Sequence, residues 1–150
     1  MSNFTPKELE YLQSQWLGRL ATVGADGTPH IVPLAYRYNP TLDTLDITGY
    51  RMRDSKKWRD IQRSGQVAFL VDDVLTNQEA RGIEVRGTAV TIEGETPLIR
   101  ITARRIIGWG LDTGTYERNS RSVNQPLFFS HHLQHKMAAQ FGGNGDDSGT

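Results

Sequence analysis

The chain contains no cysteine among its 150 residues. A disulfide framework, thiolate chemistry and cysteine-ligated zinc are therefore excluded. The chain also lacks an excess of either charge, because 17 lysines and arginines balance 17 aspartates and glutamates. Proteins dedicated to nucleic-acid binding carry a basic excess, so a formal net charge of zero argues against that class.

Long apolar runs are missing as well. The N-terminal segment MSNFTPKELE is polar and offers no stretch for a signal peptide or a membrane span. We therefore expect a cytoplasmic protein without nucleic-acid or membrane partners. The sequence also has no GxGxxG after a strand, no GxxxxGKS/T, no HExxH and no GxSxG. The usual dinucleotide, nucleotide, zinc-protease and serine-hydrolase interpretations thus have no support.

Three of the four histidines lie close together near the end of the sequence. His131, His132 and His135 have the spacing of metal ligands on one helical face, but no carboxylate or thiol accompanies them. A solvated or interface cluster is the better interpretation, and we predict no metal site.

Helix signals occur at the start and in the middle of the chain. Residues 5–8 (TPKE) combine an N-cap threonine, a proline at N1 and a capping-box glutamate at N3. With apolar residues at helical spacing after them, they predict a helix over 6–15. Asp54 or Ser55 is the expected N-cap of a second, short helix that ends at Gly65.

Strand signals dominate the remaining sequence up to residue 109. Alternating or continuous apolar runs predict six mostly antiparallel strands, and Gly87 marks a bulge in the fifth. Without a βαβ rhythm, this pattern indicates a mainly β protein with flanking helices (α+β), built as a small closed barrel. Residues 111–124 are polar, 125–141 could form a helix or an arm, and 142–150 are expected to be disordered. The predicted strands are 18–23, 30–38, 44–49, 66–71, 82–92 and 98–109.

Two smaller expectations concern aromatic and acidic residues. Trp16, Trp58 and Trp109 are expected in the core, which is the commoner position for tryptophan than a cofactor platform. Asp72 and Asp73 follow an apolar run and are expected to form a turn.

The segment RMRDSKKWR, residues 51–59, is the most informative stretch of the sequence. It places five cations where a strand ends and a helix begins. A helix start carries roughly half a positive charge, so lysines in its first turn are disfavoured by ~0.3–1 kcal/mol each. A phosphate or carboxylate bound there would remove the conflict, whereas a solvated basic surface is the alternative. The five cations are Arg51, Arg53, Lys56, Lys57 and Arg59.

Three segments carry a family resemblance: LGRLATVGADGTPHIVPLAYRYNPTLDTLDITG, SKKWRDIQRSGQVAFLVDD and ARGIEVRGTAVTIEG. Together they closely resemble the pyridoxamine-phosphate-oxidase-like split barrels, in particular the actinobacterial branch that uses the deazaflavin coenzyme F420. The segments IRITARRIIGWGLD and RNSRSV are similar to a subgroup that includes the dehydrotetracycline reductases. The resemblance implies a six-stranded, FMN-binding-like split barrel over 1–123. The tail after residue 123 has no counterpart in the family, and we expect 124–150 to be a partly disordered C-terminal extension. The resemblance also implies a homodimer with a cofactor at each side of the interface.

The resemblance also suggests roles for individual residues. It places Ser55, Lys56 and Lys57 on the cofactor phosphate, with Arg53 and Arg59 nearby. The remaining cofactor-binding candidates are Pro33, Leu34, Ala35 and Gly49 along the ring, and Trp109 as a wall from the neighbouring subunit. No catalytic group is evident, and the weak candidates for a proton donor, besides water, are His30, Tyr36 and Tyr50. For each tyrosine, a place at the barrel rim with its hydroxyl in solvent is the commoner role.

The function implied by the resemblance is an F420-dependent reductase. Such an enzyme would transfer a hydride from reduced F420 to a conjugated enone-type small molecule, for which secondary metabolism is one setting. Two alternatives remain: an FMN-dependent oxidase or reductase on the same barrel, and a non-catalytic flavin- or deazaflavin-binding protein. The sequence shows no recognisable pyridoxal-phosphate substrate site, which argues against pyridoxamine phosphate oxidation itself.

Overall fold

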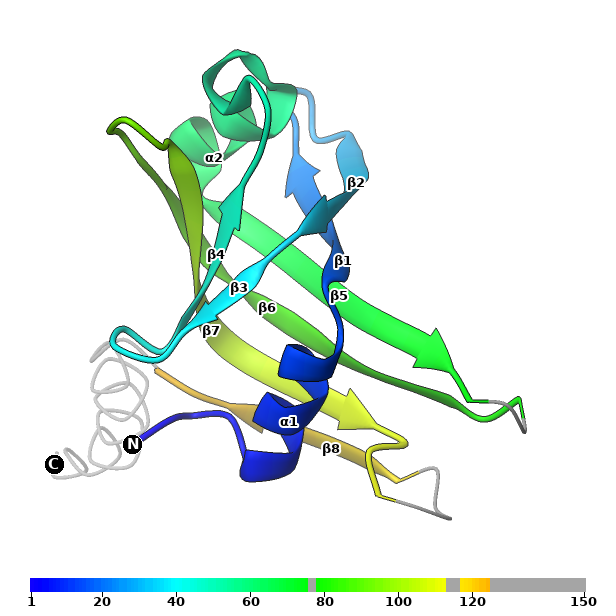
Figure 1. Ribbon diagram of the computed structural model, residues 1–150. Coiled ribbons are helices and arrows are strands. Elements are labelled where there is room, and N and C mark those ends of the chain that lie inside the picture. Colours follow the sequence, from blue (N-terminus) through cyan, green and yellow to red (C-terminus); the bar gives the residue numbers. More distant parts are fainter. Residues whose placement is uncertain (76–77, 113–116, 125–150) are drawn as a thin grey trace, which may run out of the picture.

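The computed structural model describes residues 1–75, 78–112 and 117–124, and within them one curled antiparallel sheet flanked by helices (Figure 1). The helical elements are α1 (Pro6–Ser14), the 3₁₀ turn η1 (Met52–Asp54) and α2 (Lys56–Ser64). The strands are β1 (Leu17–Val23), β2 (Pro29–Ala35), β3 (Arg37–Asn39), β4 (Thr44–Thr48), β5 (Gln66–Val74), β6 (Ala80–Ile92), β7 (Leu98–Trp109) and β8 (Arg118–Ser122).

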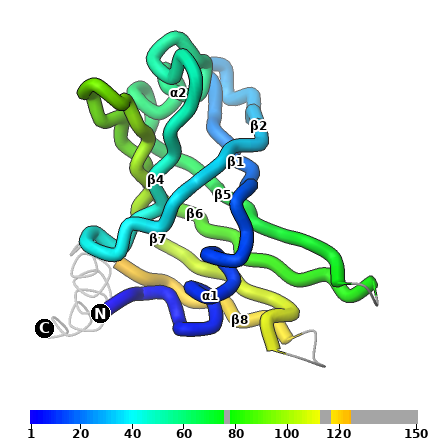
Figure 2. Tube along the Cα trace, viewed as in Figure 1, coloured from blue at the N-terminus to red at the C-terminus, as the bar shows by residue number. Residues whose placement is uncertain are grey.

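The strand order defines a split barrel. Hydrogen-bonded neighbours follow the order β2-β1-β5-β6-β7-β4-β3, and β8 pairs with β7 beyond the end of β4. The sheet curls until its two edge strands, β2 and β3, meet end to end, and Tyr36 alone separates them in the chain. Figure 2 traces this passage across the front of the barrel. The mainly β split barrel predicted from the sequence is thus confirmed, and the described residues form eight strands in place of the six expected.

The two additional strands have separate causes. The predicted strand 30–38 is interrupted at Tyr36, so that one apolar run supplies both β2 and β3. The second is β8, whose sequence RNSRS has no apolar residue and therefore no hydrophobic pattern to recognise. The expected bulge at Gly87 is confirmed, because the register between β6 and β7 shifts between Arg86 and Gly87.

The turn expected at Asp72 and Asp73 is wrong. β5 continues through both residues to Val74, paired along its length with β6. Arginines on neighbouring strands offset the two carboxylates: Arg19 lies 2.8 Å from Asp72, and Arg81 lies 2.8 Å from Asp73. Acidic residues can therefore continue a strand here because cations beside them compensate their charge.

The helices begin where the sequence predicts. The capping box of α1 is present, and α2 begins after Ser55, one of the two predicted caps, and ends at Gly65 with a positive φ of 68°. The two helices lie at opposite ends of the barrel (Figure 1). Among the described residues, no helix is long and apolar enough to cross a membrane.

The core fills the inside of the curled sheet. Alternate residues of β1, β5, β6 and β7 point inward, and Phe69 is fully buried at the centre. Of the tryptophans, Trp58 is buried as expected, and Trp109 is partly buried. The expectation for Trp16 is wrong, because 73% of this residue is exposed at the end of α1.

Candidate cofactor site

Ser55 fixes the start of α2. Its hydroxyl donates to the Met52 carbonyl at 2.6 Å and accepts from the Trp58 amide at 3.3 Å. The loop before it turns at Arg51, whose φ of 50° lies in the left-handed region. The burial of Trp58 and Ile61 then holds the helix against the barrel. The first turn of α2 is therefore firmly placed, with its N–H groups at the barrel end.

Three arginines of the cationic segment are already engaged. Arg51 pairs with Asp54 at 3.2 Å, and the Arg59 guanidinium donates to the Asp54 carbonyl at 3.2 Å. Arg53 pairs with Glu93 at 2.5 Å, on the loop between β6 and β7. All three are exposed. The arginines thus form an outer basic rim, and their proposed role beside the phosphate stays a prediction.

Lys56 is itself exposed but contacts a buried polar pair, Asp60 and Thr22. Its ammonium lies 3.2 Å from a carboxylate oxygen of Asp60, one helical turn later. The other Asp60 oxygen accepts from the Thr22 hydroxyl of β1 at 2.9 Å. Burial by itself would raise the pKa of Asp60, but the hydrogen bonds from Thr22 and Lys56 outweigh it and hold this pKa below its ordinary value. Asp60 is therefore a carboxylate that offsets the charge of Lys56.

Lys57 differs from its four cationic neighbours. Within the described part of the chain it has no acidic partner and no hydrogen bond, although it is partly buried. Burial lowers the pKa of its ammonium, since desolvation disfavours the charged form. An uncompensated, partly desolvated cation in the first turn of a helix is the arrangement that an anionic ligand would stabilise.

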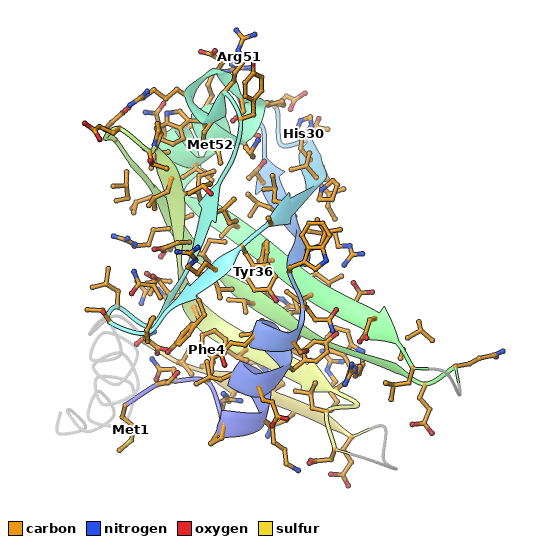
Figure 3. The ribbon with its side chains drawn as sticks, in the orientation of Figure 1. Met1, Phe4, His30, Tyr36, Arg51 and Met52 are labelled. Atoms are coloured by element: carbon orange, nitrogen blue, oxygen red, sulfur yellow. The ribbon has the colours of Figure 1, made fainter. Side chains whose placement is uncertain are left out.

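Lys56 and Lys57 border a pocket of about 220 Å³ between α2 and the hairpin of β1 and β2. The pocket is closed on the barrel side by apolar and hydroxyl side chains, and His30 stands at its margin. Figure 3 shows His30 on the hairpin at the same end of the barrel as Arg51 and Met52. The lining residues are Leu20, Thr22, His30, Ile31, Val32, Lys56 and Lys57.

Gly24 keeps the hairpin close to these groups. A Cβ at this position would lie 3.1 Å from the Lys56 ammonium and 3.4 Å from the His30 Nε2 atom. A side chain here would therefore press on the charged end of the pocket. Because Gly24 has no side chain, the backbone of the hairpin can lie close to the Lys56 ammonium and the His30 imidazole.

The expected ring-binding residues lie in two places. β2 exposes Pro33 and Ala35 and half-buries Leu34, as an edge strand that offers one side to a ligand would. Gly49 is exposed at the end of β4, where a Cβ would meet Met52 at 3.2 Å. Trp109 lies at the end of β7, away from α2 (Figure 1). Within one chain, the structure does not bring Trp109 to the lysines.

The three proton-donor candidates occupy different environments. The Tyr36 hydroxyl donates to the Leu12 carbonyl of α1, and its ring packs edge-on against Phe69 at 5.3 Å. Burial raises the pKa of Tyr36, so this hydroxyl is better suited to structure than to proton transfer. Tyr50 is 94% exposed after β4. His30 alone among the three lines the lysine pocket.

The sequence did not single out Thr22, Gly24 or Asp60. Asp60 left a readable signal, because it is an acidic residue four positions after Lys56, between Trp58 and Ile61 on the buried side of α2. Thr22 and Gly24 left none, since their roles depend on how β1 packs against α2. The described residues contain no group of three histidine, aspartate or glutamate side chains placed to hold a metal ion. The histidines at 131, 132 and 135 lie outside those residues.

Comparison with known proteins places this barrel in a family. The family model described as pyridoxamine 5'-phosphate oxidase matches residues 4–125, and the chain belongs to this family. A relative from Streptomyces rimosus subsp. rimosus, a 5a,11a-dehydrotetracycline/5a,11a-dehydrooxytetracycline reductase, is 38% identical over 131 residues. That match covers 77% of this chain and 92% of the relative.

Solved structures share the fold at low sequence identity. The conserved hypothetical protein Rv2991 from Mycobacterium tuberculosis superposes with a TM-score of 0.64 at 22% identity, covering 81% of this chain and 93% of that one. The FAD binding protein from Mycobacterium smegmatis superposes with a TM-score of 0.54 at 24% identity, covering 70% and 92%. These similarities agree with the split-barrel topology described above.

Proposed function

We propose that the protein is a reductase that binds coenzyme F420 beside α2 and delivers a hydride to a conjugated enone-type small molecule. Lys57 is the observation that carries this proposal. A partly buried cation without a described partner, next to the capped start of a helix, fits the phosphate of such a cofactor. The Streptomyces relative, which is itself a reductase, supports the oxidoreductase part of the proposal.

F420 suits this surface better than a compact ligand would. It carries a phosphodiester followed by a polyglutamate tail, so its negative charge extends over a distance. Lys57 would hold the phosphodiester, and the exposed rim of Arg51, Arg53 and Arg59 would face the tail. The apolar edge of β2 would then lie along the ring.

The protein's own groups would bind and orient, while the cofactor when bound supplies the hydride. Ser55 and Lys57 would fix the phosphate, and β2 would exclude water from one face of the ring. His30 is the best placed described side chain to pass a proton to the reduced substrate, because it lines the pocket. Solvent is the alternative proton source.

The site also leaves room for a different cofactor. FMN carries a phosphate that Ser55 and Lys57 could hold, and the FAD binding protein from Mycobacterium smegmatis shares the fold. An FMN-dependent oxidase or reductase is therefore the second candidate. A non-catalytic cofactor-binding protein is the third, because of the three proton-donor candidates only His30 lines the described pocket.

A homodimer would complete the site. Ile31 is 66% exposed on β2, and together with Leu70 and Trp109 it borders an open pocket of about 380 Å³ on the outer side of the sheet. We propose that a second copy covers this face and that Trp109 approaches the partner's cofactor from it. Sedimentation velocity with and without cofactor tests this, and a monomer in both states would contradict it.

Titration of the purified protein with F420, and separately with FMN, tests the proposed cofactor by fluorescence quenching. Tighter binding of F420 supports the reductase, and reduced F420 is then tested for oxidation in the presence of enones. Tighter binding of FMN favours the second candidate. Binding of F420 without turnover of any enone favours the third, and binding of neither compound contradicts a cofactor site beside Lys57.

A further inference from the structure

The phosphate site alone does not explain why α2 buries a carboxylate at Asp60. Asp60 is 4% exposed, on the face of α2 that packs against β1. An apolar residue would pack there without the cost of burying a carboxylate. The structure satisfies the charge through Thr22 and Lys56, whose contacts are given above. The effect of Asp60 on its surroundings is therefore chiefly electrostatic.

The charges around the pocket can be counted. Lys56 and Asp60 cancel, and Asp26 of the hairpin loop, the other carboxylate that acts on Lys56, is fully exposed, so that solvent screens its charge. Lys57 contributes one positive charge that no described carboxylate offsets. His30 is the remaining titratable group that lines the pocket. Among the lysines and carboxylates described at the pocket, Lys57 is therefore the one uncompensated charge.

We propose that Asp60 is a specificity-determining residue. By neutralising Lys56 it leaves Lys57 as the uncompensated lysine among the described pocket residues, so that the site favours a singly charged phosphodiester over a doubly charged phosphate monoester. A diester carries one charge at neutral pH, whereas a monoester with a second pKa near 6 carries about 1.5 to 2. Two cations would match the monoester, and one matches the diester. The inference rests on the proposed function, because its ligand is the phosphate of the proposed cofactor.

The Asp60→Asn variant tests this charge count. It keeps the size of the side chain and an acceptor for Thr22, but it releases the charge of Lys56. FMN is titrated against riboflavin, a ratio of affinities that isolates the phosphate. F420 is titrated against its unphosphorylated deazaflavin, a ratio that reports the phosphodiester together with the tail bonded to it. The FMN-to-riboflavin ratio should rise about tenfold, and the F420 ratio only about threefold, because electrostatic attraction scales with ligand charge. The rise should shrink in high salt.

The Lys56→Gln variant supplies the opposite test. It leaves the Asp60 charge uncompensated, so the FMN-to-riboflavin ratio should fall and should fall further than the F420 ratio. Lys7→Gln, at the same position of α1 as Lys57 in α2, controls for the loss of a lysine elsewhere and should leave both ratios unchanged. The two test variants are expected to shift the FMN-to-riboflavin ratio in opposite directions. Either variant alone therefore tests the proposal if the other fails to fold.

The outcomes separate the two proposals. Equal changes for FMN and riboflavin in Asp60→Asn or Lys56→Gln would mean that Asp60 acts only on structure, and would overturn its role. If the native protein binds F420 and the variants show such equal changes, only the proposed role of Asp60 is overturned. A native protein that prefers FMN overturns both the F420 reductase and the diester selectivity, and one that binds neither cofactor does the same.

Discussion

Lys7 and Lys57 occupy the same position, each being the second residue of a nine-residue helix. Lys7 forms an ion pair with Asp112, whereas Lys57 has no acidic partner among the described residues. The two lysines meet the same unfavourable helix dipole, but among the described residues only Lys7 has a compensating carboxylate. Their comparison separates a compensated surface cation from the cation that we propose binds the cofactor.

The Lys57→Ala variant should weaken cofactor binding by about 1.5–3 kcal/mol, the usual scale for a charged hydrogen bond. The free energy of unfolding without cofactor should change by less than about 0.5 kcal/mol, or rise, because burial already disfavours this charge. Fluorescence titration and urea unfolding measure the two quantities. Lys7→Ala is the control and should leave binding unchanged. Unchanged affinity in Lys57→Ala would remove the argument for a phosphate at this position.

At the scale of single elements, α1 and α2 both begin with a side-chain cap, Thr5 and Ser55. Only the cap of α2 stands beside the proposed phosphate. Capping needs an acceptor oxygen, which serine and aspartate supply about equally well. Phosphate binding, by contrast, requires a cap without negative charge. A substitution that keeps the acceptor oxygen but adds a negative charge can therefore distinguish capping from phosphate binding.

Ser55→Asp keeps the N-cap acceptor of α2 but loses the hydrogen bond that Ser55 donates to the Met52 carbonyl, so α2 should lose some stability. Cofactor affinity should fall by tenfold or more, because the new carboxylate repels the phosphate. Thr5→Asp, at the equivalent position of α1, should leave both quantities unchanged. Thermal unfolding monitors the helix and titration monitors the site. Equal cofactor affinity in the native protein and Ser55→Asp would place the phosphate elsewhere.

The bulge between β6 and β7 leaves no space for a side chain at Gly87. A Cβ there would lie 2.1 Å from the carbonyl oxygen of Thr102, which is backbone and cannot rotate away. Gly87→Ala should destabilise the barrel by about 1–3 kcal/mol or more. Gly27→Ala offers a comparison with open space but a positive φ of 84°, so that its cost is conformational alone. Chemical denaturation of both variants tests the crowding argument, which a neutral Gly87→Ala would refute.

At the scale of the whole molecule, stability should depend on acidic groups. Buried or half-buried aspartates that accept hydrogen bonds from partners on other segments have lowered pKa values despite some desolvation. A carboxylate with a lowered pKa stabilises the folded state above its unfolded pKa, near 3.8–3.9, and loses this contribution as the pH falls through the folded value. The residues are Asp43, Asp46, Asp60 and Asp73.

We therefore expect the free energy of unfolding to be level from pH 7 down to about pH 4 and to fall steeply below it. Urea unfolding at a series of pH values measures this profile. Asp46→Asn, which removes the acceptor charge facing Arg100 at 3.0 Å, should lower stability at pH 7 and flatten the acid slope. The same acid slope in the native protein and the variant would contradict the assignment.

The sequence predicted those features whose causes are local. Helix caps at Thr5 and Ser55, and the alternating strand from Leu98 to Trp109, depend on neighbours a few positions apart. The polar strand β8 was missed because only its pairing with β7 makes it a strand. Trp16 was misplaced because it continues the helical spacing of Leu9 and Leu12, whereas α1 ends at Ser14.

The candidate site likewise has features that the sequence predicts and features that it does not. Lys56 and Lys57 could be marked from their conflict with the helix dipole. The state of each lysine could not, because it depends on Asp60 being anchored to Thr22, 38 positions away. That distinction between two adjacent cations comes from an i,i+4 ion pair within α2 together with the packing of α2 against β1.

The edge strand β2 has a consequence for self-association. Pro29 and Pro33 stand four residues apart in β2 and so face the same side of the strand, and neither has an N–H to donate. Prolines on an edge strand remove donors that an approaching strand would need. The exposed apolar surface around Ile31 can therefore contact another molecule through its side chains. The backbone of β2, however, is a poor partner for a further hydrogen-bonded strand, which protects the open barrel against amyloid-like growth.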